Sequence, residues 1–168
     1  MRSIENIQNY FLDSKSFRDI ESKVTSLFAN LKKTEPELDI IYVAGIISSD
    51  GKDFIQRNRQ ILANNTEKVR EATRETAFVF SAEDIFDDKV IAKLDPNEIS
   101  NEENWYQFWR NVLRSGVTHI VLTPRWEESK GATDEFLTAN SIGLPIYYFN
   151  GINSHEIAWL IKTSRNSG

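Results

Sequence analysis

The stretch that decides the fold is IIYVAGIISSDG, residues 40–51. Its first five residues form an apolar run that is typical of a β-strand covered on both faces by other elements. Gly45 ends the run, a polar turn follows at 48–51, and a long helical pattern occupies about 53–74. A buried strand, a loop and a helix in this order predict the start of a parallel α/β sheet.

The same alternation continues along the chain, with an acidic connection at 83–103 that includes a short helix at 88–94. Further strands are expected at 78–80, 120–122 and 146–149, and further helices at 105–114 and 131–142. The long helix is expected to turn four apolar residues inward: Phe54, Ile61, Leu62 and Val69. The sequence therefore predicts a doubly wound α/β fold with a mostly parallel sheet of four to five strands.

Two helical patterns precede the first strand. One covers residues 3–12, and the other begins at Ser16, a favourable N-cap, and ends near Thr34. Apolar residues recur along the second pattern at helical spacing: Ile20, Val24, Leu27, Phe28 and Leu31. We expect residues 1–36 to form a helical extension and residues 37–168 the α/β domain. The extension could be an accessory clasp or an oligomer interface. A last helix capped by Ser154 is also expected.

Composition limits the partners. The net charge of −5 argues against binding to a nucleic-acid polymer. There is no cysteine, and the two histidines lie far apart, so neither a metal site nor another cofactor is expected. No apolar run is long enough for a membrane span, and the first residues lack the apolar core of a signal peptide. These features predict a cytoplasmic protein of about one domain.

Glu135 is the side chain that stands out. At about 100° per residue, Glu135 lies on the same helix face as Ala132, Ala139 and Ile142, whereas Leu137 points the opposite way. No basic residue stands three or four positions away to form an intrahelical ion pair. An inward carboxylate without a local partner is typical of functional sites. The alternative is a helix that is rotated or begins later, which would leave Glu135 exposed near a positive helix end.

The residues just before Glu135 favour the functional interpretation. Ser129 and Gly131 open the helix directly after a predicted strand. Free N–H groups at such a helix start bind anions, a glycine allows close approach, and the serine adds a hydroxyl. An anion site one turn from an inward glutamate predicts a small phosphorylated substrate with the carboxylate directed at its middle.

Two motifs also carry a resemblance to a known family. IYVAGIISSDG (41–51) and RWEESKGATDEFLTANSIGLPIYY (125–148) resemble the nucleoside 2-deoxyribosyltransferase superfamily. Within it, the spacing Ser129-x-Gly131-x-x-x-Glu135 is most similar to the 2′-deoxynucleoside 5′-phosphate N-hydrolase branch. The likeness covers roughly residues 39–149.

The resemblance implies hydrolysis or transfer of the N-glycosidic bond of a nucleoside 5′-monophosphate or related nucleotide. Glu135 would be the nucleophile that attacks the anomeric carbon of the sugar, and Tyr42 would position it. The implied residues around the sugar, base and phosphate are Gly45, Ile47, Ser48, Ser129, Gly131 and Ala132. The resemblance also implies a homo-oligomer.

One departure from the family concerns proton transfer. Arg110 aligns with an aspartate that usually protonates or orients the base, so it is expected to contact the substrate, but arginine cannot supply a proton at neutral pH. Asp84, Glu102 or Glu103 could replace that aspartate if the segment 81–104 folds over the site. The rival hypothesis is therefore a non-catalytic nucleotide-binding sensor or regulatory module. A third is a scaffold that acts through its N-terminal helices.

Several aromatic and basic residues leave two interpretations open. Trp126, in the expected site loop, could contact the base or act as a lid, or it could simply pack. Trp105 and Trp109 could stack on a base or pack within their helix. Arg59, early in the long helix, could remain solvated or reach the phosphate.

Overall fold

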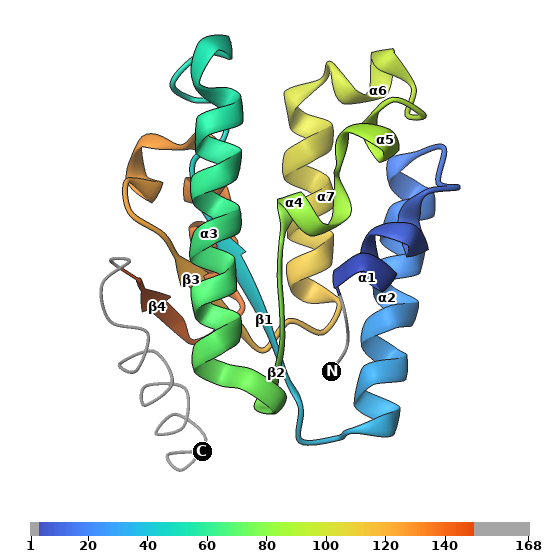
Figure 1. Cartoon of the computed structure of the whole chain (residues 1–168), viewed down its shortest axis with the longest axis vertical. Helices are drawn as coiled ribbons and strands as arrows, with labels where there is room; N and C mark the ends of the chain where they lie inside the picture. The colour runs from blue at the N-terminus through green and yellow to red at the C-terminus, as the bar shows by residue number, and fades with distance from the viewer. Residues whose placement is uncertain (1–3, 150–168) are drawn as a thin grey trace.

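The computed structural model describes residues 4–149, and its centre is a sheet of four parallel strands (Figure 1). The strands are β1 (Asp39–Ala44), β2 (Ala77–Ser81), β3 (His119–Leu122) and β4 (Ile146–Tyr148), in the order β2-β1-β3-β4. Each strand pairs in parallel with its neighbours, and helices lie on both faces. The predicted doubly wound α/β fold is confirmed.

The main helices are α1 (Ile4–Phe11), α2 (Phe17–Thr34), α3 (Ile55–Thr73), α7 (Glu102–Arg114) and α8 (Lys130–Ser141). The short ones are α4 (Ala82–Ile85), α5 (Asp88–Ile91), α6 (Pro96–Ile99) and the 3₁₀ turns η1 (Lys52–Phe54), η2 (Arg74–Thr76) and η3 (Trp126–Glu128). Ser16 caps α2 as predicted. The predicted last helix lies outside the described residues.

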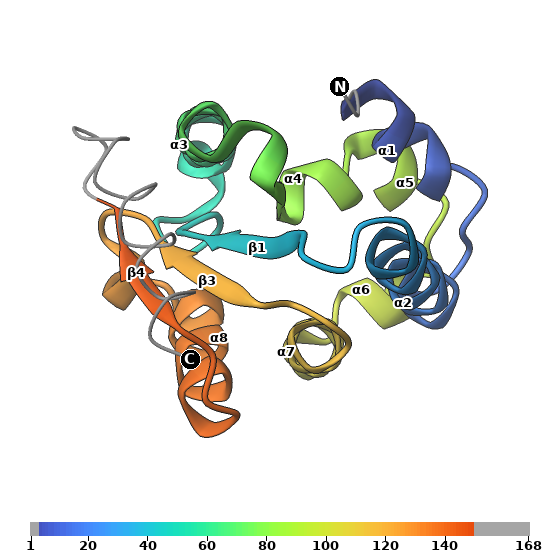
Figure 2. The same cartoon turned by 90° about the horizontal axis from the view of Figure 1, so that it is seen from below.

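The central strand is buried along its whole length, as its apolar run predicts. Ile41 and Val43 share a core with α3, whereas Ile40, Tyr42 and Ala44 share the opposite core with α2, α7 and α8. Figure 2 shows α3 on one side of the sheet and α7 and α8 on the other. Because side chains alternate along a strand, Tyr42 points toward the layer that contains α8.

The inward face of α3 differs from its prediction. Leu62 and Val69 are buried as expected, but Phe54 and Ile61 are 43% and 48% exposed. Polar side chains complete the buried stripe instead: Asn58, Asn65, Thr66 and Thr73. Each threonine hydroxyl donates to a backbone carbonyl one turn back, so these side chains enter the core with their hydrogen bonds satisfied. An analysis of apolar spacing cannot detect such a stripe.

Of the N-terminal helices, α2 packs beside α7, whereas α1 packs mainly on α4. All the predicted inward residues of α2 are buried except Leu27, which is half-buried. The Phe28 ring lies 5.4 Å from the Phe80 ring of β2. In the part of the chain that is described, α2 therefore shares one core with the α/β domain.

The acidic segment after β2 is more ordered than predicted. It forms three short helices, and four of its apolar side chains are buried: Ile85, Phe86, Val90 and Leu94. The Phe86 ring lies 5.0 Å from Phe108 of α7, which places the segment against the sheet's carboxyl end. Among the described helices, none is long and apolar enough to cross a membrane.

Candidate functional site

A cavity of about 370 Å³ opens beyond the carboxyl end of β1. Its walls come from the segments that follow β1, β2 and β3, together with α3 and α7. Parallel α/β sheets bind their ligands at this edge, and the volume is suitable for a small metabolite. The predicted residues Tyr42, Gly45, Ile47, Ser48, Ser129, Gly131, Ala132 and Glu135 all line it.

Glu135 points inward from α8, as its helical position predicts. It is 6% exposed and lies on the buried face with Ala132 and Ala139, while Leu137 on the opposite face is 57% exposed. Ile142, expected on the same stripe, is 40% exposed because α8 ends at the residue before it. The Tyr42 hydroxyl donates a hydrogen bond of 3.0 Å to Glu135 Oε1.

Burial determines the charge of this carboxyl. Loss of solvent raises the pKa of Glu135 to about 8; the hydrogen bond from Tyr42 lowers it and the Asp134 charge raises it. Burial, and then Glu135, raise the pKa of Tyr42 well above its usual range. Glu135 is therefore mostly a neutral acid at pH 7, and its ionisation needs higher pH or a positive charge beside it.

The start of α8 provides donors next to Glu135. Ser129 caps the helix, and its Oγ accepts from the Ala132 N–H at 3.1 Å. The Ala132 amide, expected to hold a phosphate, is thus already bonded. The N–H groups of Lys130 and Gly131 are the first-turn donors that no described backbone or cap interaction uses. A Cβ on Gly131 would meet nothing closer than Ser129 Oγ at 3.8 Å, so the glycine leaves this helix end open.

Gly45 has a different role. A Cβ at this position would lie 2.3 Å from Thr123 Oγ1, whose hydroxyl donates to the Ala44 carbonyl at 2.9 Å. The glycine therefore lets the ends of β1 and β3 approach closely. This approach brings the loop after β1 beside the loop that leads into α8.

Asp50 and Arg125 join these two loops at the edge of the site. Arg125 Nη2 lies 2.8 Å from Asp50 Oδ1, and Asn58 Nδ2 donates to Asp50 Oδ2 at 2.9 Å. The Arg125 guanidinium is the largest of the influences that lower the pKa of Asp50. Arg125 adopts the left-handed conformation, with φ of 67°.

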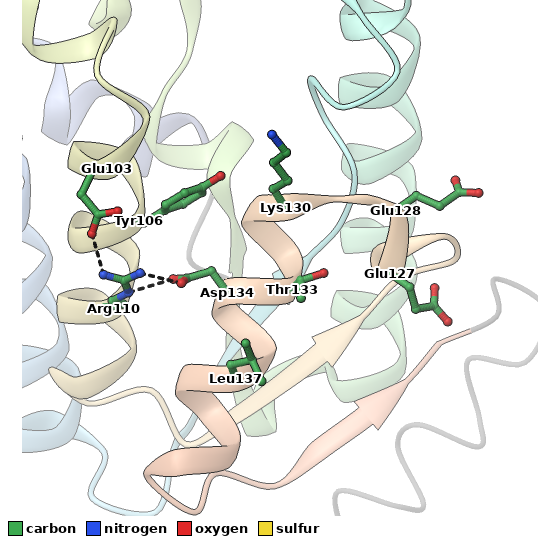
Figure 3. A pocket seen from close by; sticks show the side chains of 9 residues that line it. All are labelled: Glu103, Tyr106, Arg110, Glu127, Glu128, Lys130, Thr133, Asp134 and Leu137. Carbon is green, nitrogen blue, oxygen red and sulfur yellow. Dashed lines mark hydrogen bonds and ion pairs between the residues drawn. The ribbon is translucent and has the colours of Figure 1, made fainter.

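Arg110, expected to contact the substrate, does not line this cavity. It lies in a neighbouring open hollow between α7 and α8 (Figure 3). There its guanidinium bonds both oxygens of Asp134, at 2.6 and 3.0 Å, and Glu103 at 2.8 Å. Asp134 precedes Glu135 on α8 and so points about 100° away from it, which takes Arg110 to the outer side.

Of the three tryptophans considered, one packs outside the cavity and two line it. Trp126 packs on Phe136 and Tyr148, with ring centroids 4.8 and 6.0 Å away, and does not line the cavity, so the structure favours the packing interpretation. Trp105 and Trp109 do line it. Trp109 also stacks on the Tyr42 ring at 4.8 Å, which makes it part of the support of the Tyr42–Glu135 pair.

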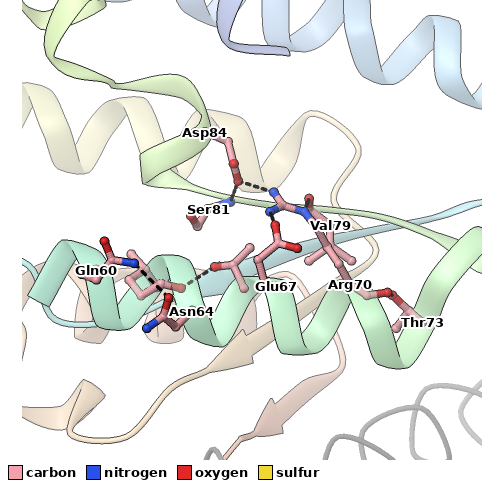
Figure 4. Close-up of polar contacts among 10 residues, drawn as sticks. Gln60, Asn64, Glu67, Arg70, Thr73, Val79, Ser81 and Asp84 are labelled. Carbon is pink, nitrogen blue, oxygen red and sulfur yellow. Dashed lines mark hydrogen bonds and ion pairs between the residues drawn. The ribbon is translucent and has the colours of Figure 1, made fainter. Parts of the chain in front are cut away.

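The segment 81–104 does fold over the site, but the acids that it offers differ from those expected. Asp84 turns away to Arg70 at 2.6 Å and to the Ser81 N–H at 2.8 Å (Figure 4). Glu103 binds Arg110. Only Glu102 of the three expected acids lines the cavity.

Sequence reasoning missed Glu83, which lines the cavity together with Arg59, the residue that could remain solvated or reach the phosphate. Arg59 Nε lies 2.8 and 2.9 Å from the two Glu83 oxygens, and its Nη1 lies 2.7 Å from Asp88. Its position along the chain could have indicated Glu83, because it follows the end of β2 by two residues, at the edge of the sheet where ligands bind.

Compared with known proteins, the chain matches no protein-family model, no curated protein and no solved structure. Within residues 4–149, no three His, Cys, Asp or Glu side chains gather as a metal site.

Proposed function

We propose that the protein cleaves the N-glycosidic bond of a nucleoside 5′-monophosphate or a related nucleotide, with Glu135 as the nucleophile. The observation that carries this proposal is a buried carboxyl held by Tyr42 in a cavity, one turn inside a helix whose Lys130 and Gly131 N–H groups take part in no described backbone or cap interaction. The resemblance of the two motifs to the nucleoside 2-deoxyribosyltransferase superfamily supports the same chemistry.

The cavity's donors suggest how such a substrate would lie. The phosphate binds the Lys130 and Gly131 amides and the hydroxyl of Ser129, whose second lone pair and proton remain for a ligand. The sugar then lies beside Glu135, one turn further along α8. The glutamate attacks the anomeric carbon, the base leaves, and water or a second base accepts the sugar from the glycosyl–enzyme ester.

The protonation of Glu135 is consistent with this role under one condition. Only about one Glu135 in ten is ionised at pH 7. Attack on the anomeric carbon therefore depends on this ionised fraction, or on the sugar's developing positive charge, which stabilises the Glu135 carboxylate. An oxocarbenium-like transition state supplies that charge next to the carboxylate. A buried, poorly hydrated carboxylate gains most from such a partner.

The test is release of free base, measured by chromatography, from a panel of ribo- and 2′-deoxyribonucleoside 5′-monophosphates. The wild-type chain releases base from at least one of them, and Glu135→Gln reduces the rate by about a thousandfold or more. Asp134→Asn is the matched control, because Asp134 lies next to Glu135 on α8 but binds Arg110 outside the cavity. Full activity in Glu135→Gln excludes the proposed role.

A second candidate is a nucleotide-binding sensor without turnover. It is favoured by Arg110, which replaces the family's usual acid and lies outside the cavity. Calorimetry separates the two hypotheses: tight nucleotide binding without base release supports the sensor, and binding with Glu135-dependent release supports the enzyme. The absence of any nucleotide binding contradicts both and leaves the scaffold hypothesis.

The resemblance also leads us to propose a homo-oligomer. Light scattering coupled to gel filtration measures the mass in solution against the 19.4 kDa of one chain. A mass of one chain at micromolar concentration contradicts this part of the proposal.

A further inference from the structure

The strand order gives the cavity two ends. β1, which carries Tyr42, lies between β2 and β3 in the sheet. The segment after β3 brings Ser129 and Gly131 to one side, and the segment after β2 brings Glu83 to the other. If the phosphate binds at the start of α8 and the sugar lies at Glu135, as in the proposed function, the base extends toward the β2 side.

Glu83 is the carboxyl at this second end, and its position is fixed. Both of its oxygens contact Arg59 Nε, and the two side chains are only 19% and 15% exposed. Arg59 also binds Asp88, whose side chain is 80% exposed. One guanidinium therefore faces two carboxylates, and the trio carries one excess negative charge.

These surroundings hold the pKa of Glu83 above its ordinary value. Burial is the largest influence and raises the pKa of Glu83, Arg59 lowers it, and the charges of Asp84 and Asp88 raise it again. Asp84 itself is neutralised by Arg70 and does not line the cavity.

No other described acid fits the base end as well. Glu102 lines the cavity too, but its Oε1 accepts a hydrogen bond from Tyr106 and its side chain is exposed. Arg110, in the position of the family's usual acid, lies in the outer hollow. Glu83 is thus the confined carboxyl that lies across the cavity from the phosphate-binding helix end.

We infer that Glu83, oriented by Arg59, is the general acid that protonates the departing base; this inference rests on the proposed function. As Glu135 attacks the anomeric carbon, the C–N bond breaks, its electron pair stays on the base nitrogen, and Glu83 donates its proton there. Glu83 is left as a carboxylate beside Arg59. Water then attacks the same carbon and gives a proton to Glu83, which restores Glu135 as a carboxylate and Glu83 as an acid.

The test compares two leaving groups in the full chain. One substrate is the natural nucleotide that the wild-type protein cleaves best, whose base needs a proton to leave. The other is the 4-nitrophenyl glycoside of the same sugar 5-phosphate, whose phenolate leaves without one. Glu83→Gln is expected to lower kcat on the natural nucleotide by about a hundredfold or more and on the nitrophenyl substrate by less than about tenfold.

Controls separate a proton donor from a structural residue. Glu71→Gln removes an exposed carboxylate of α3 that does not line the cavity and should alter both rates by less than about threefold. Equal losses on both substrates in Glu83→Gln, or no loss on either, overturn the role of Glu83 while the proposed function stands. Activity that survives in Glu135→Gln, or no cleavage of either substrate by the wild-type protein, overturns the proposed function and this inference together.

Discussion

At the residue scale, Glu135 couples the chemistry of the cavity to the stability of the fold. Its pKa is about 8 in the folded protein and 4.5 in a solvated chain, so folding favours the protonated form. The stabilising effect is complete below pH 4.5 and is lost as pH rises through 8. Each pH unit between these values removes about 1.4 kcal/mol of stability, and the whole window is worth on the order of 5 kcal/mol.

Glu135→Gln should abolish this dependence, because an amide keeps the hydrogen bond from Tyr42 and never ionises. Denaturant unfolding of the variant and the wild type at pH 5 and pH 8 measures the difference directly. We expect the variant to gain several kcal/mol relative to the wild type between the two pH values. Comparing the two proteins cancels the titration of all other groups. A constant difference across this range would mean that Glu135 is not buried as a neutral acid.

At the element scale, the sequence predicts which strand residues are buried better than it predicts which helix residues face inward. The apolar run at 40–44 predicts β1 and its two covered faces because a central parallel strand contacts apolar layers on both sides. α3 was placed correctly, but half of its predicted inward residues were wrong, because buried asparagines and threonines complete its stripe and the threonine hydroxyls bond carbonyls within the helix. Arg110 was misplaced and Glu83 was missed for another reason: the direction of each side chain depends on a partner from a distant element, Asp134 and Arg59 respectively.

Replacing the two glycines of the site by alanine should have opposite effects on the stability of the protein. Gly45→Ala forces a methyl group against Thr123 Oγ1 and should destabilise the junction of β1 and β3 by about 1–3 kcal/mol. Gly131→Ala meets no close atom inside a helix and should stabilise the protein by up to about 1 kcal/mol. Thermal unfolding of both variants measures the contrast. If Gly45→Ala is as stable as the wild type, the two strand ends do not need to approach so closely.

At the scale of the whole molecule, the site depends on packing that begins before the α/β domain. Tyr42 stacks on Trp109 of α7, and α7 in turn packs beside α2. The aromatic rings of Phe17, Phe86 and Phe108 connect the N-terminal helices to the segment over the cavity. Sequence patterns could delimit residues 1–36 but not show this connection, because the contacts join residues about 70 to 90 positions apart.

The shared core predicts that residues 37–168 do not fold alone into a stable domain. Without α2, Phe80 and the apolar face of α7 lose their cover, so the shortened chain should lack a cooperative thermal transition.

Phe28→Ala tests the same contact in the full chain and should lower the free energy of unfolding by about 3–5 kcal/mol. Ser26→Ala, at an exposed position of α2, is the matched control and should change it by less than about 0.5 kcal/mol. A truncated chain that unfolds cooperatively at the wild-type temperature would instead make the N-terminal helices an independent accessory, and the Tyr42–Glu135 pair would then keep its geometry without them.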